Sequence, residues 1–171
     1  MNQCVHVGNH IYLAIPIMAL LAIVQSSISP RFPVAGVVPQ LLFIVAMSWA
    51  LARGLAEGLV WAFIAGIFVD LFSLAPVGVS SLAFMAGVTP VLLQRAMPPN
   101  RLLVAALLTA LGTAVYLVAY TIILRFTAFS LPLRGLVELL PLILIHAVLI
   151  MPVYSLIAYS LHITRPRRVE F

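Results

Sequence analysis

The stretch from Arg53 to Ser73 reads RGLAEGLVWAFIAGIFVDLFS and determines how the rest of the chain is interpreted. It is apolar apart from Glu57 near its start and Asp70 near its end, so it predicts a helix in contact with lipid. Small residues and one carboxylate recur in it at every fourth position. These are Gly54, Gly58, Ala62, Gly66 and Asp70. That spacing places them in one slowly winding stripe along the helix.

The stripe predicts a close contact between helices. Helices in lipid associate by van der Waals packing, and small residues let two backbones approach each other. Two interpretations follow for Gly54, Gly58, Ala62 and Gly66. The stripe is either a packing groove between helices of this chain or a groove that receives a helix from a partner protein.

The whole chain shares the composition of this stretch. Of its 171 residues, 64% are hydrophobic and only 8% are charged, and the mean hydropathy is +1.22. Soluble domains are about 45–50% apolar and about 25% charged. The composition therefore excludes a soluble domain, a disordered chain and a disulfide scaffold. The single cysteine, Cys4, cannot form an internal disulfide.

Charged residues and Pro/Gly clusters divide the chain into helical spans. We predict an all-α fold, a bundle of about six transmembrane helices that forms one integral membrane domain over residues 1–171. The spans are expected near residues 11–28, 37–53, 56–74, 79–97, 100–126 and 138–162. Residues 11–28 are interpreted as a retained helix because no arginine precedes them. Six spans with short connections leave no room for a soluble catalytic domain.

The arginines predict the orientation in the membrane. Cytoplasmic loops carry an excess of positive charge. If both termini are cytoplasmic, six arginines lie inside, at positions 53, 95, 101, 165, 167 and 168, and three lie outside, at positions 31, 125 and 134. The asymmetry favours that orientation. The arginines are scattered singly, so they do not predict a nucleic-acid surface, and the tail Arg165–Arg168 is expected to contact anionic lipid headgroups.

Asp70 is the first of two ionisable residues predicted to lie inside the membrane. At about 1.5 Å per residue from Glu57, it lies about 20 Å along its helix, in the outer half of the bilayer. It is either a polar anchor beside the Ser73–Gly78 turn or a residue that lines a cavity or contacts a partner. We expect it to point into the bundle and to order the turn, with His146, Ser73 or Tyr116 relieving the cost of burial.

His146 is the second, at a similar predicted depth. It is either a neutral packing residue that forms hydrogen bonds or part of a proton relay. Tyr116 and Tyr120, with Thr113, lie near one face of the predicted fifth helix. They are interpreted as packing residues with a polar tip or, alternatively, as part of a ligand site.

Catalytic chemistry has little support in the sequence. Acid–base or nucleophilic catalysis needs at least two positioned polar groups in a wet cleft. The chain has four acidic residues and shows no metal-ligand spacing, nucleophile elbow or phosphate-binding loop. We therefore predict that the protein is not an enzyme and holds no cofactor or metal.

Residues 39–82 carry a resemblance to a known family. Pro39-Gln40-Leu41-Leu42 begins the second span, and Gly66 to Ser73 fit the pattern G-x-x-x-D-x-x-S. Pro76-Val77-Gly78 follows as a P-x-G turn. This sequence resembles the rod shape-determining protein MreD of bacteria, although Gln40 stands where that family more often has an acid.

The resemblance implies an integral subunit of the cell-elongation machinery in the bacterial inner membrane. It implies MreC as the partner, with links to RodA, a class B penicillin-binding transpeptidase and MreB. It also implies a fold similar to the substrate-binding subunits of energy-coupling-factor transporters. The alternative function is therefore a small-molecule uptake subunit, with Asp70, His146 and the tyrosines lining an outward cavity.

Overall fold

The computed structural model describes residues 11–28, 37–73, 75–96, 100–126 and 136–163, and its regular elements in these ranges are helices. They are α1 (Ile11–Ile28), α2 (Leu41–Arg53), α3 (Leu55–Leu71), α4 (Val79–Val88), the 3₁₀ helix η2 (Thr89–Ala96), α5 (Arg101–Phe126) and α6 (Leu136–Ile163). The all-helical class is confirmed. Cys4 and the tail Arg165–Arg168 lie outside the described residues.

The predicted boundaries hold within a few residues, and two prolines explain the largest differences. The second helix begins at Leu41 and not at residue 37, because proline disfavours helical geometry in the residue before it and Pro39 lies there. The fourth helix continues as a 3₁₀ helix after Val88. Pro90 has no N–H for the carbonyl of Ala86, which accepts instead from the backbone N–H of Thr89 and, at 2.7 Å, from the Thr89 hydroxyl.

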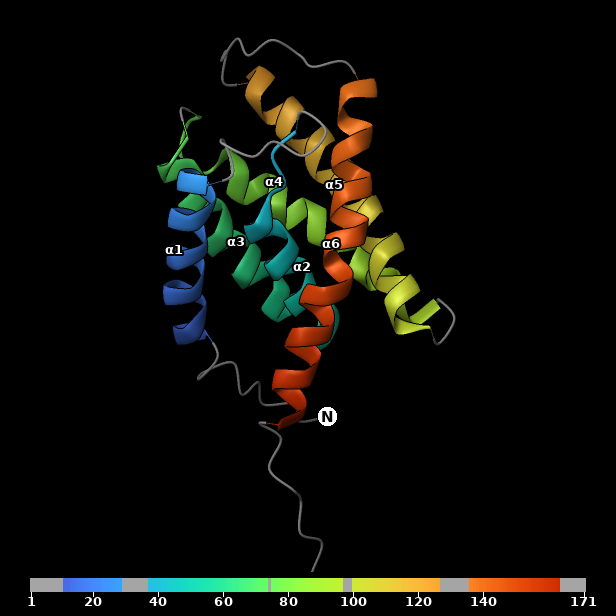
Figure 1. Cartoon of the computed structure of the whole chain (residues 1–171). Coiled ribbons are helices and arrows are strands. Elements are labelled where there is room, and N and C mark those ends of the chain that lie inside the picture. The colour runs from blue at the N-terminus through green and yellow to red at the C-terminus, as the bar shows by residue number, and fades with distance from the viewer. Residues whose placement is uncertain (1–10, 29–36, 74, 97–99, 127–135, 164–171) are drawn as a thin grey trace, which may run out of the picture.

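Within the described ranges, two helices are long and apolar enough to cross a membrane, at residues 101–126 and 140–161. The 13 residues of α2 extend only about 20 Å, less than the roughly 30 Å of a hydrocarbon core. The six-span count therefore remains a prediction. In Figure 1, α1 begins and α6 ends at the same end of the bundle.

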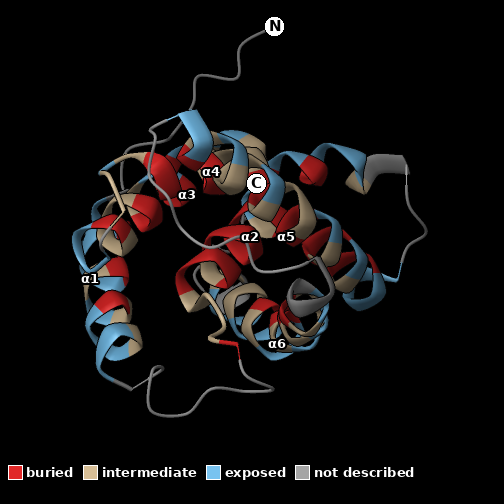
Figure 2. Ribbon diagram, turned by 90° about the horizontal axis from the view of Figure 1, so that it is seen from above, coloured by how far each residue is buried: buried red, intermediate tan, exposed pale blue. Residues whose placement is uncertain are grey.

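The short helix α2 is the centre of the fold. Figure 2 shows the other helices arranged around it, and α2 contacts each of α1, α3, α4, α5 and α6. Nine of its 13 residues are buried. A helix that is apolar on all sides is buried on all sides, as α2 is.

Glycines permit the closest approaches between helices. A Cβ atom on Gly58 would overlap Ala50 of α2 and lie 2.8 Å from its Cα. A Cβ atom on Gly66 would overlap the backbone of Ser81 in α4 and lie 2.6 Å from the carbonyl carbon of Ser80. These two positions of the stripe thus contact two different helices of the same chain.

The other two positions of the stripe are Ala62 and Gly54, and no overlap of a Cβ atom with a neighbouring helix is found at Gly54. Ala62 is fully buried. Gly54 joins α2 to α3 with a φ of 102°, and a Cβ atom there would meet nothing within 4 Å. Gly54 therefore supplies backbone freedom and not a close contact.

A third close approach, which was not predicted from the sequence, lies between α4 and α5. A Cβ atom on Gly87 would lie 3.0 Å from the carbonyl oxygen of Gly112, and one on Gly112 would overlap the carbonyl oxygen of Gly87. The Phe43 ring would lie 2.7 Å from the added atom on Gly87. The two helices therefore cross glycine against glycine, beside α2.

Large apolar side chains cover the outward faces of the bundle. They include Leu20 on α1, Leu107 on α5 and Leu144 on α6, each at least half exposed. Such faces are unfavourable in water and suit lipid. Small residues thus permit the close helix contacts inside the bundle, and the exterior is apolar.

We predict that Gly66→Ala destabilises the protein by about 1–3 kcal/mol, because the added methyl group meets backbone that cannot rotate away. The free energy of unfolding in detergent measures this effect. Ala56→Leu on the exposed side of the same helix is the control and should cost less than about 0.5 kcal/mol. Equal stability of the Gly66 and Ala56 variants would contradict the close contact.

Candidate functional site

Asp70 lies in the last turn of α3 and points into the bundle. The residue is only 2% exposed. One carboxylate oxygen, Oδ2, accepts a hydrogen bond from the backbone N–H of Gly78 at 2.7 Å. Both oxygens accept from the N–H of Ser80 at 3.2 Å. The carboxylate at the end of α3 thus forms hydrogen bonds to the backbone at the start of α4.

This geometry is a helix cap supplied by the preceding helix. Gly78 is the N-cap residue of α4, has a φ of 101° and carries no side chain that could cap. The first N–H groups of a helix lack intrahelical partners and attract negative charge. Asp70 supplies both an acceptor and that charge. Gly66, one turn earlier, lets α3 come close enough to α4 for the carboxylate to reach.

The partners that we expected for Asp70 were wrong. The carboxylate is bonded by backbone N–H groups, and no described hydrogen bond joins it to His146, Ser73 or Tyr116. The Ser73 hydroxyl donates to the backbone carbonyl of Asp70 instead, at 3.3 Å. His146 is out of reach because α3 and α6 do not touch within the described residues.

His146 is fully buried in α6 and bonds through both ring nitrogens. Its Nε2 accepts from the backbone N–H of Gln40 at 3.0 Å, and its Nδ1 lies 3.0 Å from Oγ1 of Thr113. A backbone N–H can only donate, so Nε2 must be unprotonated and the proton must sit on Nδ1. Oγ1 of Thr113 accepts the hydrogen bond from that Nδ1–H and donates its own to the carbonyl of Thr109 at 2.8 Å. This geometry matches a neutral packing histidine.

Two glutamine amides continue these hydrogen bonds to α1. The backbone N–H of Leu41 donates to Oε1 of Gln25 at 2.8 Å, and Nε2 of Gln25 donates to Oε1 of Gln40 at 2.5 Å. We call the linked side chains Gln25, Gln40, His146 and Thr113 the amide–imidazole network. It joins α1, the start of α2, α5 and α6. With the Asp70 cap between α3 and α4, polar contacts join all six described α-helices.

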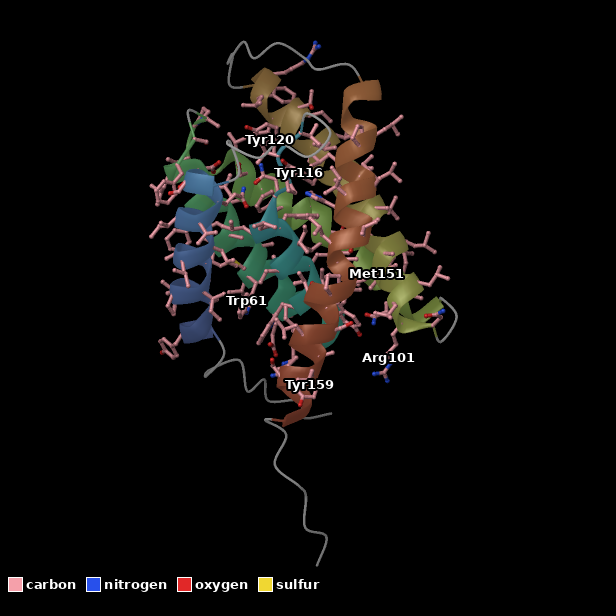
Figure 3. All side chains as sticks on the ribbon, viewed as in Figure 1. Trp61, Arg101, Tyr116, Tyr120, Met151 and Tyr159 are labelled. Atoms are coloured by element: carbon pink, nitrogen blue, oxygen red, sulfur yellow. The ribbon has the colours of Figure 1, made fainter. Side chains whose placement is uncertain are left out.

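Tyr116 packs in an aromatic cluster beside this network. Its ring stacks on Phe43 with centroids 5.4 Å apart and meets the edge of Phe84 at 5.1 Å. Tyr120 lies farther along α5, with its centroid 6.1 Å from that of Tyr116 (Figure 3). The ring of His146 stacks on the same Phe43 at 5.9 Å. The contacts of Tyr116 are those of a packing residue.

A cleft of about 170 Å³ lies next to the network, between α1, the start of α2 and the end of α3. Gln25 and Gln40 line it, with Phe72 and Ser73 from the end of α3. Asp70, His146 and Tyr116 do not. The sequence did not indicate this cleft, because nothing in it gives the two glutamines a role.

A second polar group, also missed, lies where α2 turns into α3. The Glu57 carboxylate accepts from Arg53 Nε at 3.2 Å and from Trp49 Nε1 at 3.1 Å. The Trp49 ring stacks on Trp61 with centroids 4.1 Å apart. These contacts fix the short α2–α3 connection at Gly54.

The polar groups of this site therefore bind other parts of the chain. Within the described residues, no three of His, Cys, Asp and Glu lie close enough together to hold a metal ion. Both oxygens of Asp70 and both nitrogens of His146 are bonded to groups of the chain. What these features define is a helical protein of the membrane whose buried polar groups hold its helices together.

The comparisons with known proteins add the family. The family model described as rod shape-determining protein MreD matches residues 9–163. This is nearly the whole chain, so the chain belongs to the MreD family, and the resemblance found in the sequence is confirmed. No curated protein and no solved structure matched the chain. The similarity to transporter subunits consequently remains a prediction.

We predict that Asp70→Asn is mild and Asp70→Leu is severe. The amide keeps one acceptor oxygen and loses the charge, which should cost about 1 kcal/mol. Leucine leaves the buried N–H of Ser80 and the partly buried N–H of Gly78 without an acceptor and should cost about 3 kcal/mol or more. Unfolding in nanodiscs and rescue of cell shape in a deletion strain measure both effects. Equal stability and equal rescue by the two variants would contradict the cap.

For the amide–imidazole network, His146→Leu should cost about 1–3 kcal/mol, because the N–H of Gln40 loses its acceptor. His146→Gln is the matched control, since its amide offers both an acceptor and a donor. A double-mutant cycle with Thr113→Val should give a coupling energy of about 1 kcal/mol. A coupling energy of zero would mean that the Thr113–His146 contact contributes nothing to stability.

Proposed function

We propose that this protein is a multi-pass scaffold of the cell-elongation complex in the bacterial inner membrane. It binds the membrane anchor of MreC and helps to regulate peptidoglycan synthesis. RodA, a class B penicillin-binding transpeptidase and MreB are its further contacts, and both of its termini are cytoplasmic. The observation that carries the proposal is the family match over residues 9–163.

The proposed mechanism is helix docking without chemistry. Asp70 and His146 are the two ionisable groups that an intramembrane reaction would use, and their hydrogen-bonding atoms are engaged in helix contacts. A rigid bundle with an apolar exterior suits a subunit that positions other membrane helices. This supports the assignment as a non-enzyme that needs no cofactor.

The proposal places the MreC anchor on the outward face of α6. The partner interpretation of the glycine stripe is not favoured, since Gly58 and Gly66 already contact α2 and α4. Of the two long apolar helices, α6 is the less covered by the rest of the chain. In its apolar stretch of 18 residues, 22% is buried, against 44% in the corresponding stretch of α5. Leu140, Leu144 and Val148 recur every fourth residue on its exposed side.

Uptake of a small molecule is the competing function. It requires an outward cavity lined by Asp70, His146 and the tyrosines. The described cleft is lined by none of these residues and, at about 170 Å³, is smaller than the roughly 300–1,000 Å³ of drug-sized ligand pockets. The described cleft therefore does not provide the cavity that uptake requires, and the scaffold has the support of the family match.

We predict that affinity isolation of this protein recovers a partner with a single membrane anchor. Val148→Trp, which adds a ring to the outward face of α6, should reduce recovery about tenfold, the effect of roughly 1.4 kcal/mol. Leu20→Trp on the exposed side of α1 is the matched control and should leave recovery unchanged.

Two results would contradict the scaffold. One is recovery without any membrane-anchored partner under conditions where the protein remains folded. The other is a vitamin-sized molecule retained after purification, which would favour the uptake function.

A further inference from the structure

The polar residues that line the cleft between α1, α2 and α3 lie at the ends of these helices. They are Gln25 and Ser26 of α1, Gln40 before α2, and Ser73 after α3, and the apolar residues Val38 and Phe72 line the cleft beside them. About one turn farther into the bundle, its walls are apolar. They are formed by Ala22, Leu42, Phe68 and Val69. Its occupant should therefore be polar at the helix ends and apolar toward the middle.

The hydrogen bonds fix which amide atoms the cleft presents. The N–H of Leu41 can only donate, so the Gln25 atom that faces it must be the oxygen. The Gln25 nitrogen then donates to Gln40, whose facing atom must also be the oxygen. This leaves the Gln40 nitrogen, Nε2, with two N–H groups that have no partner among the described residues. This donor pair belongs to a residue that lines the cleft and is available to an acceptor that enters it.

The acceptor should be neutral. None of the residues that line the cleft is charged. Phosphate groups are bound best by arginine or lysine. An amide donor without a neighbouring cation therefore suits a carbonyl oxygen better than a phosphate. A carbonyl at the level of the helix ends, joined to an apolar chain that runs toward the midplane, is the chemistry of a phospholipid ester.

We propose that the cleft binds the ester end of one acyl chain of an outer-leaflet phospholipid. The ester carbonyl accepts a hydrogen bond from Nε2 of Gln40, and the first methylene groups of the chain lie between Ala22 and Phe68. The cleft is large enough for this part of one chain and leaves the rest of the lipid outside. That remainder contacts the exposed rim, where Leu71 and Phe72 are more than half exposed.

This inference rests on the membrane placement in the proposed function and goes beyond it. The competing occupant is a side chain from the anchor of a partner protein. A lipid is favoured because the polarity of the cleft follows the order found in the bilayer itself, and because the rim continues into the lipid-facing surface of α3.

The test uses photo-crosslinking in nanodiscs of phosphatidylethanolamine and phosphatidylglycerol. A trace of phosphatidylglycerol carries a diazirine close to the carbonyl end of one acyl chain, and mass spectrometry maps the adducts. The control lipid has ether linkages, no carbonyl groups and the same diazirine. We expect the ester lipid to label residues 22–26 and 68–73 about tenfold more than the ether lipid, the effect of one hydrogen bond.

Two variants separate the parts of the proposal. Gln40→Glu, measured at pH 8, keeps the acceptor for Gln25 and removes the N–H pair, so it should abolish the preference for the ester lipid. Ala22→Phe fills the apolar part of the cleft and should reduce labelling by both lipids. Ala56→Phe, at the other end of α3, is its control. Thermal unfolding establishes that each variant is folded.

Equal labelling by the ester and ether lipids would overturn the proposal, as would labelling that is insensitive to Ala22→Phe. Loss of the adducts when the anchored partner is bound would assign the cleft to that partner instead of a lipid. Recovery of the partner is a separate measurement. Failure of the lipid site and failure of the scaffold are therefore distinguishable.

Discussion

The carboxylate of Asp70, at the end of α3, holds the start of α4 and is the contact on which the arrangement of this protein depends. In a bilayer, the first N–H groups of a helix have no water to bond with, and each unsatisfied group costs several kcal/mol. Asp70 satisfies two of them, on Gly78 and Ser80. Gly66 brings the two helices together, and Gly78 adopts the left-handed turn between them. The G-x-x-x-D pattern and the P-x-G turn are thus parts of one helix corner.

The same requirement explains the amide–imidazole network. Gln40 precedes α2, and its N–H is one of the unpaired groups at that helix start; His146 of α6 accepts from it. Gln25 of α1 accepts from the next N–H, that of Leu41. The starts of α2 and α4 are therefore both satisfied by side chains of other helices. Removing α1, α3 or α6 from the bundle would therefore leave a backbone donor without its acceptor.

Much of the fold was predictable because its signals are local. Charges and prolines mark helix ends, and the bounds predicted for the first helix, residues 11–28, agree with those observed. The burial of Asp70 and His146 followed from the cost of a polar group in lipid. The partner of Asp70 was not predictable, because a backbone N–H has no signature in the sequence. The contact of Gly87 with Gly112 was not predictable either, because each helix contributes a single glycine and the sequence has no repeated spacing of small residues there. The central position of α2 depends on the packing of all its neighbours.

Hydrogen–deuterium exchange at single-residue resolution tests the Asp70 cap most directly. The amides to follow are those of Gly78 and Ser80, with the protein in nanodiscs. The account predicts that both are protected in the natural protein. In Asp70→Leu they should exchange at least about tenfold faster, the effect of at least one lost hydrogen bond. Fast exchange of Gly78 and Ser80 in the natural protein, or unchanged protection in Asp70→Leu, would contradict the account.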